Sequence, residues 1–76
     1  MLNKCRQLQQ IFPNYKEDRR YIEYKNRMYD ITMSCDYYEV LQQMTVFMNS
    51  ASKNNDVFAM LAAYDIYCDV KANHEN

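Results

Sequence analysis

YIEYKNRMYDI, residues 21–31, is the stretch that decides the predicted fold of this 76-residue chain. Its apolar residues fit two periods. With a period of two, they share one face of a pair of β-strands. With a period near 3.6, one stripe of a helix is formed by Tyr21, Tyr24, Met28 and Ile31. The choice between the two periods sets both the fold class and the side chains that are left for function.

The alternating period predicts a β-hairpin over residues 20–33, with Asn26 and Arg27 as a two-residue tip. Asparagine tolerates positive φ, although the glycine usual at such a tip is missing. The expected core face of the hairpin consists of Ile22, Tyr24, Tyr29, Ile31 and Met33. Its expected solvent face carries Tyr21, Glu23, Lys25, Arg27 and Asp30. The helical alternative leaves three of the apolar residues off the stripe and uses residue types of low helix propensity, so the hairpin is preferred.

Three helices are predicted around the hairpin. The first covers about residues 2–12 and ends before Pro13, because proline keeps the preceding residue out of the α region. The second covers about 36–49 and the third about 56–70, and residues 71–76 are expected to be a frayed tail.

Local signals mark where the second and third helices begin. Asp36 followed by Glu39 is a capping box, with Ser34 as an alternative cap, and the third helix is expected to open at Asn55 or Asp56. The chain is therefore predicted to be one small α+β domain, residues 1–76: an N-terminal helix, an antiparallel β-hairpin, and two C-terminal helices packed on one face of the hairpin.

The composition excludes several classes of protein. Hydrophobic residues make up 49% of the chain, but no apolar run is long enough for a membrane span or a signal peptide. The complete lack of glycine excludes glycine-rich phosphate-binding loops. Three widely spaced cysteines indicate reduced thiols in an intracellular protein, so a cytoplasmic location is expected, the host cytoplasm if the chain is phage-encoded.

No constellation of residues indicates a catalytic or metal site. No two cysteines are close in sequence, and the only histidine, His74, lies in the predicted tail. Convergence of the three cysteines on a metal is the weaker alternative to buried thiols. Glu23 and Asp30 would face each other across the hairpin, but a solvated face of mixed charge is the preferred interpretation of that pair. No catalytic residue, metal or cofactor is predicted.

Charge is distributed unevenly along the chain. Residues 1–27 contain seven basic and three acidic residues, whereas residues 28–76 contain two basic and seven acidic residues. Asp65 and Asp69 lie four residues apart near the end of the last predicted helix, where the helix dipole disfavours negative charge. These features give eight candidate partner-binding residues: Arg19, Arg20, Tyr21, Lys25, Arg27, Asp65, Tyr67 and Asp69.

The expected function is that of a non-enzymatic protein-binding protein. In its size, its eight tyrosines, its residue bias typical of AT-rich genomes and its split charge, the chain resembles the small proteins that phages make to block host machinery, such as inhibitors of CRISPR or restriction systems. This resemblance implies an inhibitor or adaptor that binds a host enzyme or defence complex.

Two other functions are weighed as alternatives. The first is a small nucleic-acid-binding regulator that uses the basic, tyrosine-rich hairpin. The second is a phage assembly chaperone, because a hairpin followed by two helices resembles phage tail-assembly chaperones, although KNR stands at the hairpin tip where they usually carry glycine. A homodimer is a further option, and no membrane partner is expected.

Overall fold

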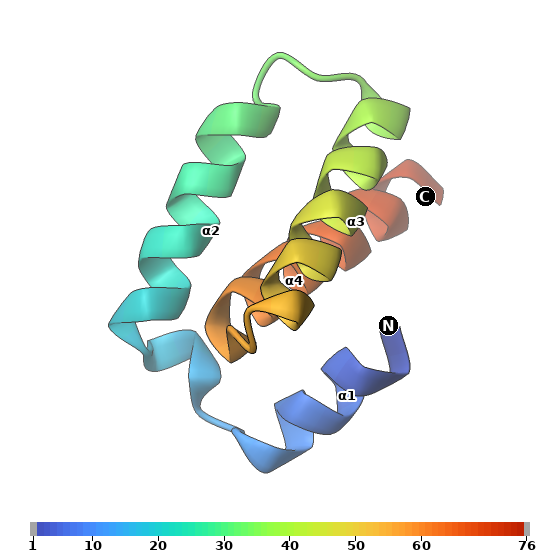
Figure 1. Cartoon of the computed structure of the whole chain (residues 1–76). Coiled ribbons are helices and arrows are strands. Elements are labelled where there is room, and N and C mark those ends of the chain that lie inside the picture. Colours follow the sequence, from blue (N-terminus) through green and yellow to red (C-terminus); the bar gives the residue numbers. More distant parts are fainter. Residues whose placement is uncertain (1, 76) are drawn as a thin grey trace.

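The computed structural model describes residues 2–75, and all regular structure in that range is helical (Figure 1). Helix α1 spans Leu2–Ile11, a short 3₁₀ turn η1 spans Tyr15–Glu17, and α2 spans Arg19–Thr32. Helix α3 spans Tyr37–Lys53 and α4 spans Val57–Glu75. The predicted α+β class is therefore wrong: no strand occurs between residues 2 and 75.

The predicted hairpin over residues 20–33 is helix α2, and its start explains why. Asp18 has extended backbone angles, and its side chain accepts a hydrogen bond from the Arg20 backbone N–H at 2.8 Å. This is a helix N-cap, which satisfies an N–H group that would otherwise lack a partner at the start of the helix. The residues expected to form the tip, Asn26 and Arg27, lie in the middle of the helix.

The two expected faces of the hairpin are wrong as well. Tyr21, expected in solvent, is only 3% exposed and belongs to the core together with Met28 and Thr32. The expected core residues Ile22, Tyr29, Ile31 and Met33 are 43–80% exposed, and Tyr24 is half-buried. The helical stripe that begins Tyr21, Tyr24, Met28 is the one that packs inward, and it continues through Thr32 rather than Ile31.

The other helices lie close to their expected positions; α1 ends at Ile11, about where expected, whereas α3 and α4 run further at their C-terminal ends. The Asp36 side chain accepts from the Glu39 N–H at 2.9 Å, so Asp36 caps α3 as predicted. Helix α3 continues four residues beyond the expected end at residue 49, and α4 includes most of the expected tail. Within that tail, His74 stacks on Tyr37 with ring centroids 3.6 Å apart, while residue 76 lies outside the described range.

Helix α4 is the centre of the molecule. Helices α2 and α3 make their most extensive contacts with α4, and α1 also packs on it, whereas α2 and α3 make few contacts with each other. Residues 59–66 of α4 are buried on every side, as expected for a helix surrounded by others. The largest fully buried side chains are Met44, Met48, Met60, Leu61, Ile66 and Cys5. None of the described helices combines the length and apolar character needed to cross a membrane.

Candidate functional site

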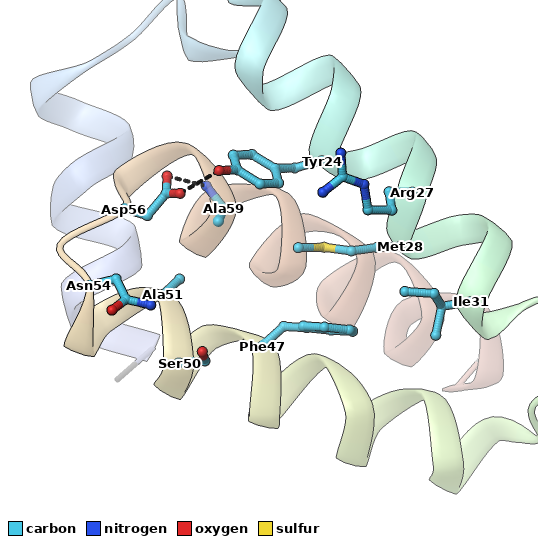
Figure 2. A pocket seen from close by; sticks show the side chains of 10 residues that line it. All are labelled: Tyr24, Arg27, Met28, Ile31, Phe47, Ser50, Ala51, Asn54, Asp56 and Ala59. Atoms are coloured by element: carbon cyan, nitrogen blue, oxygen red, sulfur yellow. Dashed lines mark hydrogen bonds between the residues drawn. The ribbon is translucent and has the colours of Figure 1, made fainter.

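A pocket lies between α2 and α3, because both helices pack on α4 more than on each other (Figure 2). Its volume is about 260 Å³. Figure 2 shows α2 forming one wall and α3 the opposite wall, with the start of α4 at one end. We call this feature the α2–α3 groove, and its lining residues are Tyr24, Arg27, Met28, Ile31, Phe47, Ser50, Ala51, Asn54, Asp56 and Ala59.

The middle of the groove is apolar. Met28 and Ala51 are buried core residues that reach its base, and Phe47 packs against the same core from the α3 side. Ile31 stands on the α2 wall and is 46% exposed. An apolar side chain that lines a concave surface and remains half in water is well placed to be covered by another molecule.

Asp56 closes one end of the groove, and each of its carboxylate oxygens accepts a hydrogen bond. One carboxylate oxygen accepts from the Ala59 backbone N–H at 3.2 Å and so caps α4. The other accepts from the Tyr24 hydroxyl at 2.6 Å, and this hydrogen bond raises the pKa of the Tyr24 phenol. The hydrogen bond from Tyr24 therefore holds α2 against the start of α4. Both donors are neutral groups, so they position the carboxylate without pairing its charge.

The turn that positions this end of the groove depends on an asparagine. Asn55 has φ of 55°, in the left-handed region, directly after the end of α3. The Asp56 N–H donates to the Ala51 carbonyl at 2.9 Å and the Asn55 N–H donates to the Ser52 carbonyl at 3.2 Å. This is the Schellman pattern, in which asparagine takes the position that glycine usually occupies.

Arg27 supplies the open charge of the groove. It is exposed, its guanidinium lies 5.9 Å from the centre of the Tyr24 ring, and no carboxylate in the described residues lies within ion-pairing distance of it. By contrast, Arg20 lies about two turns earlier in α2, and its guanidinium is already paired with Asp18 at 3.1 Å. A molecule entering the groove therefore meets an apolar base, the unpaired cation of Arg27 on the α2 wall, and the hydrogen-bonded carboxylate of Asp56 at one end.

The other predicted site residues are dispersed. Arg19 forms an exposed ion pair with Glu23 at 3.0 Å, and Arg20 also lies over the Phe58 ring at 4.2 Å. The Lys25 ammonium lies 5.5 Å from the centre of the Tyr21 ring. Of the eight candidates, only Arg27 lines the α2–α3 groove.

The proposed acidic strip on the last helix does not exist as a single surface. Asp69 is exposed and Tyr67 is half-buried, but Asp65 is only 8% exposed. Its carboxylate accepts from the Tyr21 hydroxyl at 2.6 Å, the Tyr15 hydroxyl at 2.8 Å and the Gln9 side-chain amide at 3.2 Å. We call these four residues the Asp65 network, and it leaves neither Asp65 nor Tyr21 available to a partner.

The Asp65 network also perturbs its tyrosines. Burial, together with the hydrogen bonds to Asp65, raises the pKa of Tyr15 and of Tyr21 far above the ordinary value for a phenol. The two rings pack edge to face with centroids 5.1 Å apart. This network was missed at the sequence level, although an aspartate inside the apolar run from Ala59 to Ile66 was a sign of a buried carboxylate that needs donors.

The cysteines and the histidine lie apart from the groove. Cys5 is buried, which raises the pKa of its thiol, while Cys35 is half-buried and Cys68 is exposed, and all three are free thiols. Within residues 2–75, no group of three or more His, Cys, Asp or Glu side chains is placed to hold a metal ion.

Comparison of the chain with protein-family models, with curated protein sequences and with solved structures found no match.

Proposed function

We propose that this chain is a non-enzymatic protein-binding protein, an inhibitor or adaptor, that takes an acidic amphipathic helix of a partner protein into the α2–α3 groove. Such a helix lays its apolar face into a groove and uses side chains one turn apart as anchors. The observation that carries the proposal is the half-exposed Ile31 on the wall of a groove with an apolar base.

The apolar lining supports a helix as the occupant. Helix α2 presents Met28 and Ile31 about one turn apart, and α3 presents Phe47 opposite them (Figure 2). Covering Ile31 and the exposed part of Phe47 removes apolar surface from water at about 25 cal/mol for each Å². Two walls formed by helices also give a third helix a surface of ridges and grooves on which to pack.

The charges support an acidic partner. Asp56, the carboxylate among the lining residues, is engaged by Tyr24 and by the helix cap, whereas Arg27 has no ion pair among the described residues. A carboxylate of the partner beside Arg27 would form a charge-assisted hydrogen bond at the edge of the apolar contact.

The position of the only histidine supports a non-enzymatic role. His74 stacks on Tyr37 near the C-terminal end of α4, whereas the groove lies at the other end of that helix. His74 lies eighteen positions after Asp56, or about 27 Å along the axis of α4. The resemblance to phage inhibitors in size and composition makes host proteins the first partners to examine.

The test is affinity capture with matched variants. Ile31→Glu and Arg27→Glu place negative charge in the groove, while Val46→Glu does the same on the outer side of α3, where Val46 is 55% exposed. We expect a captured protein that is retained by the wild type and by Val46→Glu and is lost with both groove variants. Thermal unfolding should differ little among the variants, because all three side chains are exposed.

A photo-crosslinking amino acid identifies the bound segment. Placed at position 31, it should link to an acidic amphipathic helix of the captured protein, and placed at position 46 it should not. Equal loss of capture in all three variants, or a cross-linked segment without acidic residues, would contradict the proposal.

A further inference from the structure

Helix α2 carries a second exposed apolar surface, on the side opposite the α2–α3 groove. Ile22 and Ile31 are nine residues apart, which places them on opposite sides of a helix, and they are almost equally exposed at 45% and 46%. On the side of Ile22, four residues are spaced at steps of four, three and four: Ile22, Asn26, Tyr29 and Met33. This is the spacing of alternate d and a positions in a coiled coil, and we call these four residues the α2 stripe.

All four residues of the α2 stripe are exposed to solvent in the described chain. Tyr29 is 43% exposed and Met33, which ends the helix in helical backbone geometry, is 80% exposed. Asn26 is also exposed. A coiled-coil pattern of this kind on the outside of a small domain is a surface that a second helix with the same spacing can cover.

We propose that the α2 stripe is the interface of a homodimer, in which α2 of a second copy packs against it in parallel orientation. The proposal concerns a different side of α2 from the groove, so a partner helix and the second copy would bind without competing. The interface is isologous, with each stripe residue facing its own counterpart across a two-fold axis.

The charges beside the stripe select the second copy as the occupant and the parallel orientation. Lys25 and Asp30 stand on opposite edges of the stripe, at g and e positions, and neither has an ion-pair partner within 4.0 Å among the described residues. In a parallel pair, g and e positions five residues apart meet, so each Lys25 faces Asp30 of the other copy, twice per dimer. An antiparallel pair would instead bring Glu23 of each copy toward Asp30 of the other, which is a contact between like charges.

The stripe also contains the polar residue that parallel dimers use. Asn26 falls at an a position in the middle of the stripe, where the two asparagines of a parallel pair meet and can hydrogen-bond side chain to side chain. In an antiparallel pair Asn26 would lie opposite Tyr29, so this interaction would be absent. The asparagine therefore favours the same orientation as the charges.

Sedimentation across a range of concentrations tests the dimer. The wild type should show a reversible monomer–dimer equilibrium, Ile22→Glu should weaken it at least tenfold, and Ile31→Glu, the matched variant on the other side of α2, should leave it unchanged. A wild type that remains monomeric at millimolar concentration, or equal effects of the two isoleucine variants, would overturn the proposal.

A charge reversal tests the pairing itself. Lys25→Glu and Asp30→Lys should each weaken the dimer, because each creates two like-charge contacts, and the double variant should restore it. Absence of restoration would overturn the parallel register.

Disulfide formation between copies tests the orientation. In a Cys35→Ser, Cys68→Ser background, Asn26→Cys should form an intermolecular disulfide on mild oxidation, whereas Glu23→Cys should not. The reverse result would show that the orientation is wrong.

Discussion

At the scale of single residues, Asp65 joins more segments of the structure than any other polar side chain among residues 2–75. Its donors come from three segments: Gln9 from α1, Tyr15 from η1 and Tyr21 from α2. Burying a carboxylate is costly unless hydrogen bonds replace its water, and three donors do so here. One carboxylate on the central helix thereby ties the N-terminal third of the chain to α4.

Removing one donor should destabilise the fold measurably. Tyr21→Phe keeps the buried ring but deletes the hydroxyl that donates to Asp65 at 2.6 Å. Hydrogen bonds to charged groups contribute about 1.5 to 3 kcal/mol, so we expect the free energy of unfolding to fall by about that amount. Urea unfolding followed by circular dichroism measures the change.

The matched control is another tyrosine of the same helix. Tyr29 is partly exposed and its hydroxyl makes no hydrogen bond within the described residues, so Tyr29→Phe should change the free energy of unfolding by less than about 0.5 kcal/mol. Similar losses for the two variants would show that the Tyr21 hydroxyl has no special role.

The sequence carried only part of this information. It did indicate that Asp65 breaks local helix preferences, but this signal is the same for an aspartate on the surface and for a buried one. The groups that donate hydrogen bonds to Asp65 are 44 to 56 residues away in the sequence, and no local pattern connects them to it. Asp65 and Tyr21 were therefore predicted as interface residues when they form the interior.

At the scale of elements, the sequence predicts what is local and fails where tertiary contacts decide. Asp36 and Asp56 cap α3 and α4 as their sequence context indicates. The stretch 21–31 satisfies both periods, and the decision for a helix comes from the Asp18 cap and from distant acceptors for the tyrosine hydroxyls. The same applies to the predicted tail, because residues 71–75 are helical and His74 stacks on Tyr37.

The connection between α3 and α4 gives a test at this scale. Asn55 adopts a left-handed conformation, which costs residues with a Cβ about 1 to 2 kcal/mol, and asparagine tolerates it better than alanine. We expect Asn55→Ala to lower the free energy of unfolding by about 1 kcal/mol, while Asn55→Gly should be neutral or stabilising. Chemical denaturation of the two variants measures both effects.

The neighbouring asparagine serves as the control. Asn54 has a negative φ of −94°, so alanine fits there without backbone strain and Asn54→Ala should have a much smaller effect than Asn55→Ala. A larger loss at position 54 than at position 55 would contradict the role assigned to the left-handed turn.

At the scale of the whole molecule, α2 and α3 run in opposite directions on the two sides of the groove. The start of α2 lies at the same end of the molecule as the end of α3, while the end of α2 and the start of α3 lie at the other end (Figure 1). The sequence shows unequal charge in the two halves of the chain, but it does not predict the groove, because a groove between α2 and α3 exists only when both helices pack on α4. Of the predicted interface, Arg27 alone falls in that groove.

The Asp65 network also predicts how the whole fold responds to alkali. The pKa of Tyr15 and of Tyr21 is raised by burial and by the hydrogen bonds to Asp65, so in the native state both phenols keep their protons above the ordinary value of 10.0. In the unfolded chain they ionise near that value. Above it the native state binds more protons than the unfolded state, and the free energy of unfolding falls as the pH rises.

The stability that these two phenols contribute should therefore be fully present below about pH 10 and should decline as the pH increases beyond it. Urea midpoints measured at a series of alkaline pH values give the slope, and phenolate absorbance should show two tyrosines that ionise only as the protein unfolds. Tyr21→Phe should make the decline shallower, because one of the two phenols is removed, while Tyr38→Phe, which removes an exposed phenol of α3, should leave the slope unchanged. An equal slope in the wild type and in Tyr21→Phe would mean that the Asp65 network does not couple folding to alkaline pH.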